Sequence, residues 1–120
     1  MKKLLTLLLP VLLVLSGTTA RADQDMVLIT GEHWVKSSLE QKRAFLFGIG
    51  NVLEIEEAMA GNDYESLRGR SIVPVLLEGL SGTSVASIVT QLDTFYASHS
   101  DQVNRPVIEV LYLEMALPNL

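Results

Sequence analysis

The sequence predicts a small all-α protein, a bundle or irregular array of four to five helices. Apolar residues recur at helical spacing in stretches that begin with serine or proline start signals, and polar loops of a few residues separate these stretches. Of the 120 residues, the first 22 form a targeting segment, which leaves 98 residues. That length is enough for one domain with one modest core.

Residues 1–22 have the three parts of a secretory signal peptide. Two lysines precede the apolar run Leu4 to Leu15, and Ala20-Arg21-Ala22 is a small-residue cleavage site. The apolar run is shorter than the roughly 20 residues that cross a membrane, so we expect cleavage rather than an anchor. The mature chain, residues 23–120, is then a single helical domain secreted across the inner membrane, most simply to the periplasm.

The first half of the mature chain predicts one long helix. Residues 23–36 read as a short extended lead-in. Ser37 or Ser38 can form a capping box with the glutamate or glutamine three residues later, and a helix over about 39–60 follows. Gly61-Asn62 supplies a left-handed stop, and Asp63 can cap a short continuation through Leu67.

Two further helices are expected in the second half. Residues 71–80 are apolar with Pro74 near the start, which favours a short helix, with a buried strand as the alternative. The next stretch begins at Thr83 or Ser84 and places five apolar residues on one helical face. These are Val85, Ile88, Val89, Leu92 and Tyr96.

A final helix follows the polar loop of residues 99–105. It opens at Pro106, reaches about Ala116 and ends before Pro118. Apart from Glu109 and Glu114 it is apolar almost all round. Such a helix either lies at the centre of the fold or is covered by a partner. In the second case the partner can be another copy of the chain, so self-association through this helix is the alternative.

Charge and cysteine content exclude several classes of function. The net charge of the chain is −5, and removing residues 1–22 takes away three basic residues and no acidic ones, which makes it −8. Binding to nucleic acid or anionic lipid needs Lys and Arg clusters that this chain lacks, whereas basic partners or cations fit. The alternative is that the negative charge serves only to keep a small secreted domain soluble. Without cysteine, neither a disulfide nor lipid attachment through a cysteine is available.

Two charges of the long helix, Lys42 and Glu56, fall within its apolar arc. They lie about 21 Å apart along the helix axis and cannot pair with each other. Asp93, at the border of the apolar face of residues 85–96, is the expected partner of Lys42. We interpret the pair as a structural ion pair that fixes the register of the two helices. The alternative is that the two charges form a polar pocket with a function.

No catalytic, metal-binding or cofactor-binding residue is predicted. His33 and His99 are the only histidines, and neither has a second ligand at helical spacing. Glu54, Glu56 and Glu57 diverge around a helix, so at least Glu54 and Glu57 belong to a solvated face.

Aromatic residues and two glycines are candidates for contacts. Trp34, Tyr64 and Tyr96 are candidate anchors for a protein partner, with packing over helix ends as the alternative for Trp34 and Tyr96. Gly48 and Gly50 each weaken the interior of a helix, which predicts a close helix contact at one of them.

Four short patterns together resemble a known set of proteins. They are Gly31-x-x-Trp34, Ser38-x-x-x-Lys42, Gly48 and the Leu92-Asp93-x-Phe95-Tyr96 run. Over residues 31–113 the chain resembles small, secreted, all-helical bacterial proteins of mostly unassigned function. That set is broadly similar to the periplasmic immunity proteins that neutralise peptidoglycan-amidase toxins of type VI secretion, although this chain lacks their cysteines. The resemblance implies a helical protein-binding domain and supplies no catalytic residue.

Three classes of function follow from these observations. The first is a non-catalytic periplasmic protein that binds another envelope protein through an apolar, acid-rimmed helical surface, in its sharpest form an immunity or inhibitor protein. The second is an acid-stress or folding chaperone of the envelope. The third is a small enzyme that acts on the cell wall, for which a cleft with a strongly perturbed carboxylate or histidine would be the evidence.

Overall fold

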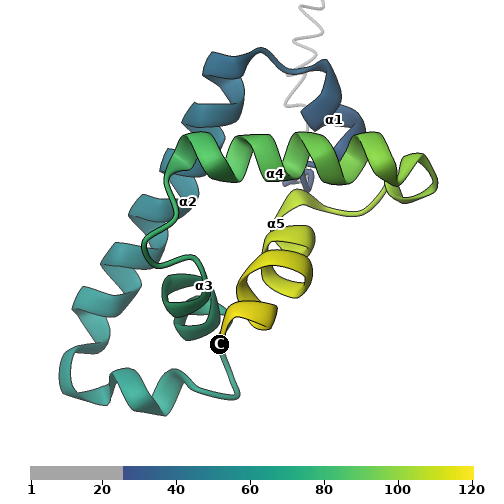
Figure 1. Cartoon of the computed structure of the whole chain (residues 1–120). Coiled ribbons are helices and arrows are strands. Elements are labelled where there is room, and N and C mark those ends of the chain that lie inside the picture. Colours follow the sequence, from purple (N-terminus) through teal and green to yellow (C-terminus); the bar gives the residue numbers. More distant parts are fainter. Residues whose placement is uncertain (1–25) are drawn as a thin grey trace, which may run out of the picture.

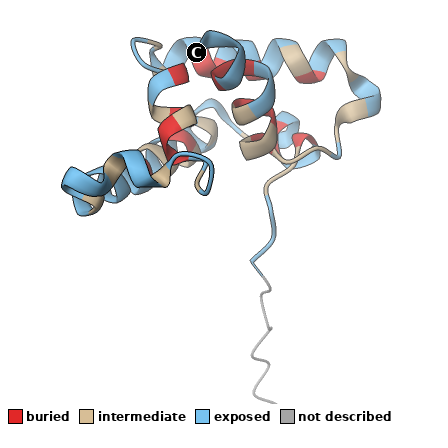
Figure 2. Cartoon of the chain, turned by 90° about the horizontal axis from the view of Figure 1, so that it is seen from below, coloured by how far each residue is buried: buried red, intermediate tan, exposed pale blue. Residues whose placement is uncertain are grey.

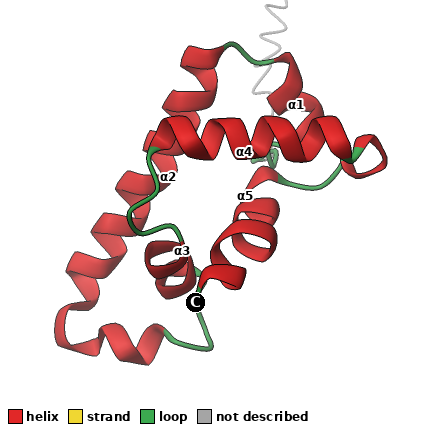
Figure 3. Ribbon diagram, in the orientation of Figure 1, coloured by secondary structure: helices red, strands yellow, loops and turns green. Residues whose placement is uncertain are grey.

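The computed structural model describes residues 26–120, and the expected signal peptide lies outside the described residues. Within this range the chain is all-α, as predicted, with five α-helices and short 3₁₀ and π turns (Figure 1, Figure 3). Extended pairing in residues 26–120 is limited to one antiparallel bridge between Thr30 and Pro106. No helix in this range is both long and apolar enough to cross a membrane.

The segment before the long helix is the predicted non-helical lead-in only as far as Thr30, which is extended, and the rest of it is helical. It contains the short helix α1 (Gly31–Lys36), whose start is capped by the His33 ring accepting the Thr30 N–H at 3.1 Å. The Gly31 N–H donates to the Arg105 carbonyl at 3.1 Å and ties α1 to the distant loop before α5. A Cβ at Gly31 would overlap the Tyr96 ring. Six residues hold too little periodicity to be recognised, so tertiary contacts decide this helix.

The long helix α2 (Leu39–Ala60) has the predicted bounds. Ser38 and Gln41 form the predicted capping box: the Gln41 N–H donates to Ser38 Oγ at 3.1 Å, and the Ser38 N–H donates to Gln41 Oε1 at 2.9 Å. Gly61, with φ of +50°, ends the helix, and a 3₁₀ turn, η1 (Gly61–Leu67), continues the chain.

Residues 71–80 form a helix rather than the alternative strand. This helix, α3 (Val73–Gly79), has Pro74 in its first turn. After a turn comes α4 (Val85–Ser98), which Ser84 caps by accepting the Ser87 N–H at 3.1 Å. The predicted inner face of α4 is buried from Ile88 onward, and a single 3₁₀ turn, η2 (Ser100–Gln102), lies in the polar loop.

The C-terminal segment is helical over the predicted range but changes its winding. It begins as α5 (Val107–Val110), widens into a π-helix, η3 (Leu111–Ala116), and ends in a 3₁₀ turn, η4 (Leu117–Asn119). Its apolar residues lie at the centre of the fold, since Val107, Val110, Leu111 and Ala116 are at most 1% exposed. These side chains are used within the chain, whereas Leu113 and Leu117 in the same segment are each 43% exposed.

One core serves the described chain. Its fully buried residues come from every α-helix except α2, which adds only Leu46 and Leu53. α3 and η3 approach so closely that a Cβ at Gly79 would overlap the Ala116 backbone. The far end of α2 and η1 project from this core as an exposed arm (Figure 2).

Candidate functional site

Three of the residues singled out in the sequence meet at one carboxylate. Asp93 Oδ1 accepts the Lys42 ammonium at 2.8 Å and the Trp34 indole N–H at 2.8 Å. The Lys42 ammonium also lies 5.4 Å from the centre of the Trp34 ring. The expected Lys42–Asp93 pair is therefore present, and it joins α1, α2 and α4.

This cluster holds three helices together. Trp34 is 1% exposed and packs edge-on to Phe45, with ring centres 6.4 Å apart. Every buried side-chain nitrogen and oxygen in residues 26–120 has a hydrogen-bond partner. The pair accordingly fits the expected role in helix register.

For two of the three candidate aromatic anchors, Trp34 and Tyr96, the structure supports the alternative role, packing within the chain. Trp34 and Tyr96 are core residues, and the Tyr96 hydroxyl donates to the Arg105 carbonyl at 3.0 Å. Burial raises the pKa of Tyr96 to about 12. Both side chains are used inside the chain because α1, α4 and the loop before α5 close over them. A partner cannot reach either ring without unfolding this region.

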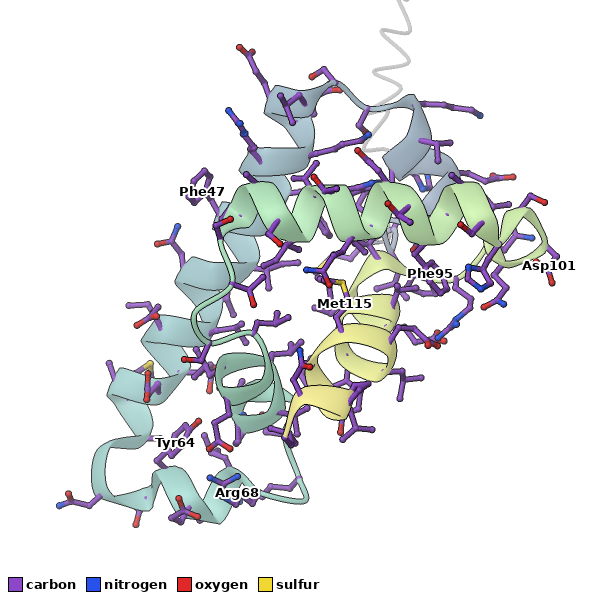
Figure 4. All side chains as sticks on the ribbon, in the orientation of Figure 1. Phe47, Tyr64, Arg68, Phe95, Asp101 and Met115 are labelled. Atoms are coloured by element: carbon purple, nitrogen blue, oxygen red, sulfur yellow. The ribbon has the colours of Figure 1, made fainter. Side chains whose placement is uncertain are left out.

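Tyr64 is the candidate anchor that stays within reach of a partner. It is half-buried on η1 and points back toward α3 (Figure 4). Partial burial raises the pKa of Tyr64, and the carboxylates of Glu78 and Glu57 raise it further.

The expectations for the rest of α2 are also corrected. Glu56 was expected at or near the core, but it is exposed. Gly48 and Gly50 were expected to allow a close helix contact, yet a Cβ at either would meet no atom within 4 Å. The reason is common to all three: the neighbouring helices cover a narrower arc of α2 than its apolar residues span.

The uncovered arc belongs to an apolar stripe that begins at Phe45, which packs on the edge of the core, and continues along the exposed side of α2; we call it the outer stripe. Its members are spaced at i, i+3, i+7, i+10 and i+14, the spacing of a helix seam. Val52, Ile55 and Met59 are 61%, 59% and 79% exposed. The outer stripe consists of Phe45, Gly48, Val52, Ile55 and Met59.

A groove of about 390 Å³ runs beside the first half of the outer stripe. One wall belongs to α2, and the other is formed by α3 with the residue before it and by α5. The groove is apolar throughout, without a charged or hydrogen-bonding side chain in its lining. The lining residues are Phe45, Gly48, Ile49, Val52, Leu53, Ile72, Val73, Leu76 and Ile108.

Acidic side chains surround this surface. Glu56 lies four residues after Val52 and three before Met59, so it shares their side of the helix. From residue 44 to residue 67 the chain carries five acidic residues and no lysine or arginine. These acids are Glu54, Glu56, Glu57, Asp63 and Glu65, and all are exposed.

The next basic residues along the chain, Arg68 and Arg70, line a second hollow of about 390 Å³ that meets the groove at Ile72. Arg68 is already bound between Glu65 and Glu78, and its guanidinium lowers the pKa of Glu65 by hydrogen bonding to it (Figure 4). Arg70 donates to the Ser66 hydroxyl at 3.1 Å.

Within residues 26–120, no three His, Asp or Glu side chains come together as metal ligands would. Comparison of the chain with protein-family models, curated proteins and solved structures finds no match. The outer stripe and its groove form an exposed apolar surface of the kind that marks interaction sites.

The apolar stripe of this surface could have been predicted from the sequence. α2 has more apolar positions than one buried face can use, because Ile55 and Met59 lie outside the arc of Leu46, Ile49 and Leu53. A second stripe at seam spacing follows from the residue numbers alone. Which of the two stripes is covered depends on where α3 and α4 pack.

Proposed function

We propose that this protein is a non-catalytic protein-binding domain of the bacterial envelope, and that the outer stripe of α2 with its groove is the binding surface. The observation that carries the proposal is a continuous apolar surface left uncovered on an otherwise ordinary small domain. Exposed contiguous apolar patches rimmed by polar residues mark interaction sites. The centre of such an interface is apolar, and charged groups lie at its rim.

The sharpest form of this function is an immunity or inhibitor protein, which holds a secreted enzyme inactive by covering part of it. Support comes from the secretory N-terminus, from the small helical build, and from the resemblance to amidase immunity proteins. Tyr64, half-buried at the end of the arm, adds an aromatic side chain to the same side of the molecule as Glu57 and Glu78.

A pull-down from envelope extract of the source bacterium tests the proposal. The bait is the mature chain, and the variants are Ile55→Ser and Met59→Ser, which change exposed side chains and leave the core intact. We expect the wild-type chain to retain a specific partner and each variant to lose it.

The matched control is Val35→Ser, because Val35 is an apolar side chain with comparable exposure, 51%, on α1. This variant should retain the partner as well as the wild type does. Retention of the partner by all four chains would show that the outer stripe is not the binding surface. Turnover of a cell-wall substrate that a single carboxylate substitution abolishes would replace the proposal with an enzyme.

A further inference from the structure

We infer that the partner element is an amphipathic α-helix with a cationic polar face, lying along the outer stripe and in its groove. This inference rests on the protein-binding function proposed above and adds the shape and the charge of what is bound. A second copy of the chain is the competing occupant of the same surface, and the experiment below distinguishes the two.

The spacing of the outer stripe indicates a helix as the occupant. Residues alternating at three and four positions form a straight seam along α2, and seams of this kind receive the side chains of a second helix. From Phe45 to Met59 the seam is about 21 Å long, or about four helical turns. An extended strand would find little to bind here, because every backbone group of α2 in this region is used within the helix.

Gly48 makes room for such a helix. A Cβ at this position would meet no atom within 4 Å, and both Gly48 and the exposed Val52 line the groove. The glycine therefore forms a notch in the seam, between the larger side chains of Phe45 and Val52. A leucine-sized side chain from a partner helix fits a notch of this kind, as a knob fits a hole.

The charges indicate a cationic occupant. Glu56 adjoins the seam, because it lies four residues after Val52 and three before Met59. Two bases of α2 precede the seam: Lys42 is engaged by Asp93, and Arg43 lies on the opposite side of the helix from the seam. With five acids and no base in residues 44–67, the arm attracts basic side chains over its whole length.

The same charges disfavour a second copy. Two copies that pair through their outer stripes would bring two such acidic arms to one interface, at a net charge of −8 for each mature chain. Like charges across an interface are costly. A basic amphipathic helix meets the same apolar seam without that cost.

Designed peptides of about 18 residues test the inference, because this length covers the seam. One has leucine at seam spacing and lysine elsewhere, a second has the same leucines with glutamate in place of lysine, and a third is a scrambled form of the first. Binding of the labelled peptides to the mature chain is followed by fluorescence anisotropy at low and at moderate salt.

We expect the cationic helix to bind at least about tenfold tighter than both other peptides, and to weaken as salt is added. Ile55→Ser and Met59→Ser should each weaken it about tenfold, and Val35→Ser should not. Glu56→Lys should raise the affinity of the protein for the glutamate peptide and so reduce its preference for the lysine peptide.

Three results would overturn the inference, and they separate it from the proposed function. If the lysine and glutamate peptides bind equally well, the inferred preference for a cationic helix is wrong and the proposed protein-binding surface stands. Failure of every peptide to bind, together with a dimer in sedimentation that Ile55→Ser dissociates, makes the occupant a second copy. If no peptide binds, the chain sediments as a monomer and the pull-down retains no partner, then both the inference and the proposed function are wrong.

Discussion

Asp93 is the residue on which three helices depend. One of its oxygens accepts both the Lys42 ammonium and the Trp34 indole N–H, each at 2.8 Å. The Lys42 side chain is 13% exposed and that of Asp93 is 46% exposed, so the pair is partly shielded from water. Removal of the carboxylate leaves two donors without a partner, and the Trp34 N–H is the one that water reaches least.

Substitution of Asp93 should separate charge from hydrogen bonding. Asp93→Ala should lower the free energy of unfolding by about 2 kcal/mol, because it removes both bonds. Asp93→Asn keeps an oxygen for the indole and loses the charge, so it should cost about 1 kcal/mol. Urea unfolding measures both values. A double-mutant cycle with Lys42→Met should give a coupling near 1 kcal/mol, and zero coupling would show that the contact contributes nothing.

Ionisation of the Tyr96 hydroxyl should make the folded protein less stable at alkaline pH. Burial raises its pKa from 10.0 to about 12 in the folded state. Below the unfolded value both states keep the proton, so the contribution of Tyr96 is fully present there. As pH rises through 10 toward 12, the unfolded state loses its proton first and the folded state is destabilised.

The check is urea unfolding at a series of pH values up to 12. Tyr96→Phe should cost about 1 kcal/mol at neutral pH through its lost hydrogen bond, and its stability should then fall less steeply with pH than that of the wild type. Tyr112→Phe is the control for the loss of one hydroxyl. Parallel pH curves for the wild type and Tyr96→Phe would contradict the assignment.

At the scale of elements, α2 differs from the other helices in how it is used. Its 22 residues bury only Leu46 and Leu53, whereas the seven residues of α3 bury four. A surface helix with one covered stripe needs far less apolar side chain than α2 carries. The excess lies on the outer stripe, where Val52, Ile55 and Met59 are exposed in the described part of the chain.

Two glycines in helices should respond in opposite ways to alanine. Gly79→Ala places a Cβ against the Ala116 backbone and should lower the free energy of unfolding by more than about 2 kcal/mol. Gly48→Ala adds a methyl group in open space within α2 and should raise it by about 1 kcal/mol, since alanine favours the helix. Urea unfolding measures both, and a similar effect at the two positions would mean that the contact between α3 and η3 is looser than described.

At the scale of the whole molecule, stability is concentrated on one side. The C-terminal segment fills the centre, and residues 54–59 of α2 are all exposed. Native-state hydrogen exchange should therefore find the amides of η3 protected at least about tenfold more strongly than those of residues 54–60. Exchange of η3 at the rate of the 99–105 loop would show that the C-terminal helix is not central.

Some features of this protein follow from local residue patterns. The bounds of α2 are set by the Ser38 capping box and by Gly61, and each acts within a few residues of its own position. The inner face of α4 follows in the same way from its spacing. The Lys42–Asp93 contact was also predictable, because each charge sits at an apolar face where it needs a partner.

Other features depend on residues distant in sequence. α1 is a helix because Trp34 and Gly31 pack against α4 and its loop, and the π winding of η3 accompanies its close contact with α3. Trp34 is a core residue, while Val52 and Glu56 are surface residues. Helical periodicity shows that a stripe is apolar, but it carries no information about which neighbour covers the stripe.

The all-α class, the long helix and the acidic charge are properties of the sequence by itself, because they arise from interactions between residues close along the chain and from simple composition. The location of the binding surface belongs to the tertiary structure. α2 carries two apolar stripes that its sequence makes nearly equivalent, and the packing of α3, α4 and α5 covers one and leaves the other in water. Burial is a relation between elements, and only the folded arrangement of all five helices decides it.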